Sequence, residues 1–108
     1  MDGVKCIIAI VERGKADKIV DKAKKAGAKG ATIIYGRGTG ESEVMKFLNI
    51  NIEASKEIIL VLSEEKKYKS IYDAIIEAGR LKEPGTGIIF TLPVENLVGL
   101  RHRRKFER

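Results

Sequence analysis

Two stretches, KAGAKGATIIYG at residues 25–36 and EAGRLKEPGTGIIF at residues 77–90, decide the fold because they repeat one local pattern. Each begins near an Ala-Gly pair that favours a helix end, passes a further glycine and enters an isoleucine-rich stretch that favours a strand. Their separation of about fifty residues indicates a duplicated strand–helix–strand unit. Two such units interleaved in one antiparallel sheet predict an α+β, ferredoxin-like sandwich of order βαββαβ.

Hydrophobic periodicity supplies the remaining elements. Strands are expected at residues 4–11, 31–35, 57–62 and 87–94. A helix over residues 16–26 has an apolar stripe made by Ile19, Val20 and Ala23, and Gly27 stands where its C-terminal cap belongs. We interpret Ser63 as the N-cap of a second helix that extends to Gly79. The apolar stripe of that second helix consists of Tyr68, Ile71, Tyr72, Ile75 and Ile76.

In this fold both helices pack on one face of the sheet, and the other face is left uncovered. A chain of 108 residues forms a single domain, residues 1–108, and is too small to cover that face itself. We therefore expect a homo-oligomer in which the sheets of different subunits pack together.

Composition excludes several classes of protein. No apolar run approaches the ~20 residues that span a bilayer, so a cytoplasmic location is expected. The formal charge of +6 is spread along the chain and clusters only in the basic tail, residues 101–108; with six aromatics and no Trp, we expect no nucleic-acid partner. Cys6 and His102 are each the sole residue of their type, so we predict no disulfide, no metal site and no enzyme activity.

Two glycine-bearing segments, residues 36–40 (GRGTG) and residues 85–87 (GTG), occupy equivalent positions in the two halves, and we interpret both as loops. Glycine permits positive φ and lets a ligand approach backbone N–H groups, as in anion-binding nests. GRGTG lacks the Gly-Lys-Ser/Thr of a P-loop, and Glu41 stands where the third glycine of the dinucleotide fingerprint is due. The residues alone leave two interpretations open: a phosphate-binding loop that uses Arg37, or a plain flexible loop with a solvated arginine.

The motifs GAKGAT, GRG, EPGTG and IIFTLPV, followed by an arginine-bearing tail, resemble in order and length the P-II nitrogen-regulatory signalling proteins. The resemblance is closest to a P-II-like branch with a short Gly-Arg-Gly-Thr-Gly loop. It implies a homotrimer packed through the sheets, with no obligatory cofactor and an adenine nucleotide as effector in clefts between subunits. It also implies a mobile loop through which a partner is regulated, such as a membrane transporter or a nitrogen-metabolism enzyme.

The same resemblance implies roles for individual residues. Thr32 matches the threonine that meets the adenine, and residues 36–38 match the backbone beside the ribose and phosphates. Residues 85–87 match a second glycine loop, and the tail supplies arginines for the phosphates. The nucleotide-binding residues so implied are Thr32, Gly36, Arg37, Gly38, Gly85, Thr86, Gly87, Arg101 and Arg103.

Two departures from the family pattern bear on the choice of nucleotide. Ile88 replaces the lysine that contacts the β- and γ-phosphates, and Gly99 replaces the first tail arginine. Each lost charge-assisted hydrogen bond is worth roughly 1.5 to 3 kcal/mol. We therefore expect AMP or ADP to be favoured over ATP.

The flexible loop is expected at about residues 37–49, shorter than the effector loop of the family and without a tyrosine for nucleotidylylation. Its apolar side chains are compatible either with packing between subunits or with a surface that meets a partner. The partner-binding residues implied are Thr39, Gly40, Glu41, Ser42, Glu43, Met45 and Phe47.

Other functions were weighed against this one. A divalent-cation-tolerance-like trimer would share the sheet arrangement without nucleotide regulation, but it would not need the GRG and GTG segments. A small ferredoxin-like enzyme or RNA binder is a further alternative, although the expected sheet lacks the aromatic pair that RNA-recognition folds display.

Overall fold

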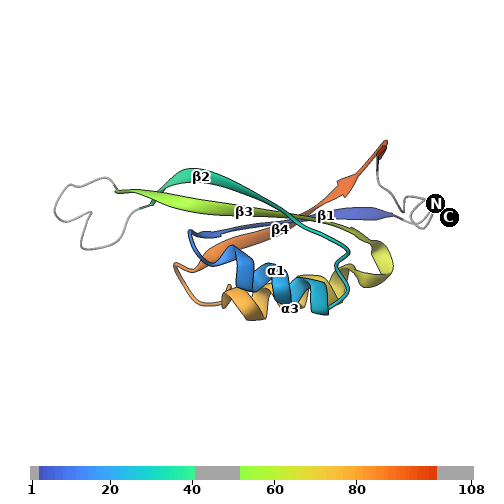
Figure 1. Cartoon of the computed structure of the whole chain (residues 1–108), viewed down its shortest axis with the longest axis horizontal. Helices are drawn as coiled ribbons and strands as arrows, with labels where there is room; N and C mark the ends of the chain where they lie inside the picture. Colours follow the sequence, from blue (N-terminus) through green and yellow to red (C-terminus); the bar gives the residue numbers. More distant parts are fainter. Residues whose placement is uncertain (1–2, 41–51, 100–108) are drawn as a thin grey trace.

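The chain folds as βαββαβ, as the duplicated pattern predicts. A computed structural model describes residues 3–40 and 52–99. The elements are β1 (Val4–Glu12), α1 (Ala16–Lys25), β2 (Thr32–Gly40), β3 (Ile52–Glu64), α3 (Glu65–Gly79) and β4 (Gly87–Val94). The strands form one sheet of order β2-β3-β1-β4, in which all three neighbouring pairs are antiparallel (Figure 1). This is the ferredoxin-like arrangement, and that prediction is confirmed.

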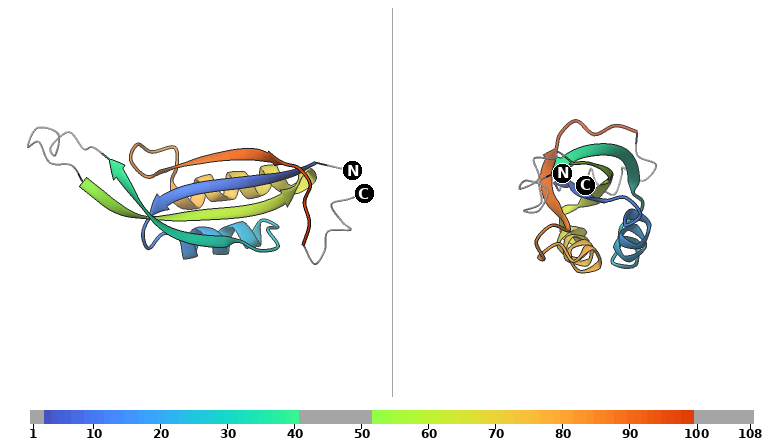
Figure 2. Two further views of the ribbon diagram at one scale, coloured as in Figure 1. Left: turned by 90° about the horizontal axis from the view of Figure 1, so that it is seen from above. Right: turned by 90° about the vertical axis from the view of Figure 1, so that its left-hand side faces the viewer.

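Both helices lie side by side against one face of the sheet (Figures 1 and 2). That face holds the core, because alternate residues of β1 and β3 point towards the helices. The core residues are Ile7, Ala9 and Val11 of β1, Ile59 and Val61 of β3, Ala16, Ile19, Val20 and Ala23 of α1, Ala28 after that helix, and Ile71 and Ile75 of α3. Tyr68 and Tyr72 pack partly buried against this cluster, which agrees with their place on the expected stripe.

The helix boundaries agree with the pattern except at one cap. α1 ends at Lys25, and Gly27 has a φ of 121°, a backbone conformation that glycine favours. α3 ends at Gly79, after which Arg80 takes the left-handed conformation. The prediction of Ser63 as N-cap is wrong: Ser63 is buried at the end of β3, and the N-cap position is Glu64. β3 ends at Glu64, directly before the first helical residue Glu65, so Ser63 is still paired in the sheet, opposite Lys5 of β1.

The largest departure from expectation is the length of the β2–β3 hairpin. β2 continues through Gly40 and β3 begins at Ile52, so the antiparallel pairs extend from Thr32 and Leu60 to Gly40 and Ile52. The interpretation of residues 36–40 as a loop is therefore wrong, because they form the outer part of a strand. Of the predicted loop at 37–49, only residues 37–40 are described, and residues 41–49 lie outside the described part of the chain.

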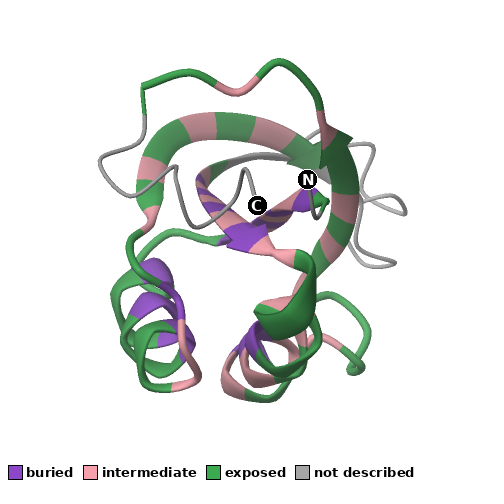
Figure 3. Cartoon of the chain, turned by 90° about the vertical axis from the view of Figure 1, so that its right-hand side faces the viewer, coloured by how far each residue is buried: buried purple, intermediate pink, exposed green. Residues whose placement is uncertain are grey.

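The second face of the sheet is covered by neither helix, as predicted. Ile88, Phe90 and Leu92 of β4 are 56%, 39% and 48% exposed, and Ile34 of β2 is 44% exposed. β1 and β3 fill the centre of this face with half-buried side chains, and Figure 3 shows intermediate and exposed residues along the strands. A continuous apolar sheet face is thus presented to the surroundings by a single chain. We call it the open face.

Candidate functional site

The first glycine segment lies where β2 runs close beside the side chains of β3. A Cβ atom on Gly36 would stand 3.3 Å from Cδ1 of Ile58, and one on Gly38 would stand 3.3 Å from Cγ of Lys56. Glycine at these positions lets neighbouring side chains lie over the bare backbone of the strand. Thr32, the residue matched to adenine, is exposed at the start of the same strand, four residues before Gly36.

A small pocket of about 180 Å³ adjoins Gly36, and its lining includes two cations that the sequence did not single out. It is lined by Arg13, Tyr35, Gly36, Ser55 and Lys56. Three elements meet here: the end of β1 with its following turn, β2, and β3. The Arg13 backbone N–H donates to the Ser55 carbonyl at 3.3 Å, which fixes the turn against β3. Cationic side chains beside glycine backbone form a setting suited to an anionic ligand.

Glu57 connects β3 to the N-terminus of α1, next to this pocket. It is only 6% exposed, and its Oε1 accepts hydrogen bonds from the backbone N–H groups of Gly14 at 2.8 Å and Ala16 at 2.9 Å. The first helical N–H groups have no partner within a helix, so a carboxylate there serves as a cap and meets the positive end of the helix dipole. The cap comes from β3 rather than from the preceding turn, and it therefore ties α1 to the strand that carries Lys56.

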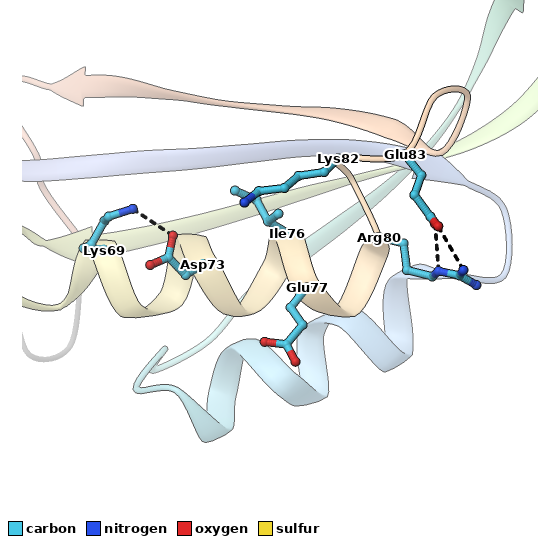
Figure 4. A pocket seen from close by; sticks show the side chains of 7 residues that line it. All are labelled: Lys69, Asp73, Ile76, Glu77, Arg80, Lys82 and Glu83. Atoms are coloured by element: carbon cyan, nitrogen blue, oxygen red, sulfur yellow. Dashed lines mark hydrogen bonds and ion pairs between the residues drawn. The ribbon is translucent and has the colours of Figure 1, made fainter.

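The second glycine segment precedes β4 and is held by contacts within its own turn. The Thr86 hydroxyl lies 2.8 Å from the Arg80 carbonyl oxygen and 2.9 Å from that of Glu83, to which it donates. Figure 4 shows the Arg80 guanidinium paired with the Glu83 carboxylate, where Nε and Oε2 are 2.7 Å apart. The Thr86 side chain is thus engaged in the turn.

Gly87 has no tolerable substitute at the start of β4. Its φ is 148°, and a Cβ atom would stand 2.5 Å from the carbonyl oxygen of Ile10. Gly85 also has a positive φ, of 78°, but open space surrounds it. The exposed side chain of Ile88 follows on the open face, so the structure places no cation where the family pattern has a lysine.

The two glycine segments lie at the same end of the sheet but on opposite edges. Gly36 of β2 pairs with Lys56 of β3, which pairs with Glu12 of β1, while Gly87 of β4 pairs with the adjacent Val11. β3 and β1 therefore lie between them, and each strand spacing is about 4.8 Å. Arg101, Arg103 and the partner residues from Glu41 to Phe47 lie outside the described residues, whereas Thr39 and Gly40 are the last residues of β2.

The described part of the chain offers few other reactive or metal-binding side chains. Burial raises the pKa of the Cys6 thiol, which favours its protonated form over the nucleophilic thiolate. No group of three His, Cys, Asp or Glu side chains capable of holding a metal occurs within residues 3–40 and 52–99. Neither of the two described helices combines the length and apolarity that a bilayer crossing demands.

A larger hollow of about 630 Å³ runs along α3 and the turn after it, and Figure 4 shows its charged lining. Three cations and three carboxylates line it. Two ion pairs, Lys69 with Asp73 and Arg80 with Glu83, satisfy most of these charges internally. The balance of signs gives this hollow no preference for an anion or a cation.

Comparison with known proteins decides the family. A family model described as "Nitrogen regulatory protein P-II" matches residues 4–104. The chain belongs to the P-II family. A P-II protein of Microchaete diplosiphon is 29% identical over 107 residues, covering 94% of this chain and 96% of that protein. A GlnB-like protein of the nifHD nitrogen-fixation region of Methanothermobacter marburgensis is 29% identical over 103 residues, with coverage of 94% and 98%.

Solved P-II structures share the fold. The ATP complex of B. subtilis GlnK superposes with a TM-score of 0.74 at 14% identity, covering 94% of this chain and 92% of that one. Arabidopsis thaliana PII bound to citrate gives a TM-score of 0.71 at 24% identity, with coverage of 94% and 86%. The family expected from the glycine motifs is thus confirmed, and this P-II chain belongs to a family of regulatory signal transducers rather than enzymes.

Proposed function

We propose that this P-II protein binds an adenine nucleotide, with AMP or ADP favoured, in clefts between the subunits of a homotrimer. Nucleotide binding would regulate a partner, such as a membrane transporter or a nitrogen-metabolism enzyme, through the segment that follows β2. The observation that carries the proposal is the position of the two glycine segments at one end of the sheet but on opposite edges. A nucleotide that contacts both types of segment is accommodated most simply where edges of different subunits meet.

The open face supports assembly through the sheets. Exposed Ile34, Ile88, Phe90 and Leu92 surround a half-buried centre on β1 and β3. Burying apolar surface contributes about 25 cal/mol per Å², so an exposed face of this kind strongly favours association. Three subunits packed in this way, as the resemblance implies, would bring β2 of one chain towards β4 of another.

The pocket beside Gly36 supports phosphate binding. Arg13 and Lys56 flank backbone that carries no side chain, and Arg37 follows in the strand. Thr32 would meet the adenine, residues 85–87 would offer backbone N–H groups, and Arg101 and Arg103 would add charge from the tail. The solved GlnK neighbour is itself an ATP complex. Ile88 supports the smaller nucleotides, because an isoleucine cannot neutralise β- and γ-phosphates.

The partner-binding part of the proposal concerns the outer β2 segment and the residues after it. Thr39 and Gly40 end the strand, and Glu41, Ser42, Glu43, Met45 and Phe47 follow them. A nucleotide bound beside Gly36 would lie at the root of this segment. For regulation, the nucleotide must favour one arrangement of the segment over another.

Calorimetric titration with AMP, ADP and ATP tests nucleotide binding, and light scattering measures the subunit number. We expect a trimer with AMP or ADP bound more tightly than ATP. Replacing Arg13 with Gln should weaken AMP binding about tenfold or more, as loss of a charge-assisted hydrogen bond predicts. Lys66→Gln is the matched control, because it removes one exposed charge from α3 and should leave the affinity unchanged. An intact trimer that binds none of the three nucleotides at millimolar concentration would defeat the nucleotide proposal.

A separate variant tests whether the subunits associate through the open face. Phe90→Glu places a charge on the open face, and we expect it to lower the mass measured by light scattering from trimer towards monomer. Thr39→Glu, which alters charge at the outer end of β2, is the control for the added carboxylate. A trimer that survives Phe90→Glu unchanged would show that subunits associate through another surface.

A further inference from the structure

Within the described part of this P-II protein, the excess of positive charge lies on one helix and its flanking turns. Residues 15–29, which comprise α1 and its flanking turns, carry six lysines and two aspartates, and all six lysines are exposed. The remaining described residues carry nine lysines and arginines and nine carboxylates. The described part of the chain is thus electrically balanced apart from α1 and its turns.

These lysines border a groove of about 600 Å³ between α1 and α3. Lys18, Lys22 and Lys25 line its α1 side at positions i, i+4 and i+7, which places them on one face of the helix. Ala74 and Ala78 of α3 contribute small side chains to the lining. The two helices that contribute its lining lie together on the side of the sheet away from the open face (Figure 2).

Two of the groove lysines have no neutralising partner among residues 3–40 and 52–99. Lys25 pairs with Asp21 at 3.2 Å, and Arg80 at the end of the groove pairs with Glu83. Lys18 and Lys22 make no ion pair with any residue in the described part of the chain. Among the described lining residues Glu77 is the single carboxylate, so this part of the groove presents an excess of positive charge.

We propose that this groove binds an acidic segment of a partner protein, in which Lys18 and Lys22 contact its carboxylates. The charge of the groove is complementary to such a segment, and small residues in its lining leave room for a narrow chain. An anionic membrane fits less well, because every large apolar side chain exposed in the described residues lies on the strands or after β4, and none lies on a helix. Nucleic acid fits less well because none of the described lining residues is aromatic and could stack on a base.

The test uses fluorescence anisotropy with a labelled octaglutamate peptide and the full chain at low salt. We expect the double variant Lys18→Gln/Lys22→Gln to weaken binding about tenfold, the combined effect of two exposed ion pairs. Lys66→Gln/Lys82→Gln is the matched control: it removes the same charge from exposed positions outside the groove and should weaken binding no more than about twofold. Circular dichroism of both variants verifies that they remain folded.

Equal weakening by the two double variants would overturn the proposal, because it would show attraction to net charge rather than to the groove. It would also be overturned if Lys18→Gln/Lys22→Gln impaired binding of oligothymidylate or of phosphatidylserine vesicles more than binding of the peptide. The proposal does not rest on nucleotide binding. The groove variant should keep the AMP affinity of the unaltered protein, so the two proposals can fail separately.

Discussion

Removing the Glu57 carboxylate should destabilise the protein far more than removing any exposed carboxylate. Glu57→Ala takes away the shared acceptor of two backbone N–H groups, at 2.8 Å from Gly14 and 2.9 Å from Ala16. The Ala16 N–H is buried, so losing its partner costs about 1 to 3 kcal/mol. Gly14 lies at the surface and can bond to water instead, which reduces its share to about 0.5 to 1 kcal/mol. With the lost packing of the side chain, we expect a loss of about 3 kcal/mol in the free energy of unfolding.

The assay is urea denaturation followed by circular dichroism, at one subunit concentration because association shifts apparent stability. Glu57→Gln keeps an acceptor oxygen while removing the charge, and should lose about 1 to 1.5 kcal/mol. Glu12→Ala, at an exposed strand end, is the matched control and should lie within about 0.5 kcal/mol of the unaltered protein. If Glu57→Ala were as stable as Glu12→Ala, the inferred cap between β3 and α1 would be refuted.

Three further predictions follow from the structure. Gly87→Ala should lower the free energy of unfolding by about 3 kcal/mol, because the new Cβ would clash with the Ile10 carbonyl oxygen and alanine disfavours the positive φ at this position. Gly85→Ala meets only the unfavourable φ and should lose about 1 to 2 kcal/mol. Thermal unfolding measures both losses. Ile88→Lys should tighten ATP binding in calorimetry about tenfold while leaving AMP unchanged, and an equal gain for both nucleotides would contradict a contact with the outer phosphates. Cys6 is the sole thiol, and burial raises its pKa, so it should react with iodoacetamide at pH 8 more slowly in the folded protein than in urea. Equal rates in the two states would contradict burial of the thiol.

The sequence predicted the elements and their order because each is encoded by local signals. Gly27 and Gly79 stand at helix ends, and the apolar stripe of α3 places Ile71 and Ile75 in the core. Duplication then supplied the topology, since interleaving two like units leaves few arrangements of four strands. The uncovered sheet face followed from the same topology and needed no knowledge of individual contacts.

The outer hairpin and the pocket could not be predicted in this way. Gly36 and Gly38 are unfavourable in strands by propensity, and they pair here only because residues 53–56 supply partners across the hairpin. Arg13 and Lys56 are more than forty residues apart in sequence and ordinary in context, so only the strand register shows that they converge. Ser63 was wrongly predicted as a helix cap from its residue type alone: serine favours N-cap positions, but here it is buried in a strand that continues past it.

The unbroken β2–β3 ladder constrains how the length of this hairpin can change. Successive residues of a strand face opposite sides, so adding or deleting one residue within residues 36–40 would turn every later side chain to the other face. A change of two residues in each strand preserves facing and register, and lengthens the paired arm by about 7 Å. Engineering can therefore lengthen the paired strands in steps of residue pairs while each strand residue keeps its face of the sheet.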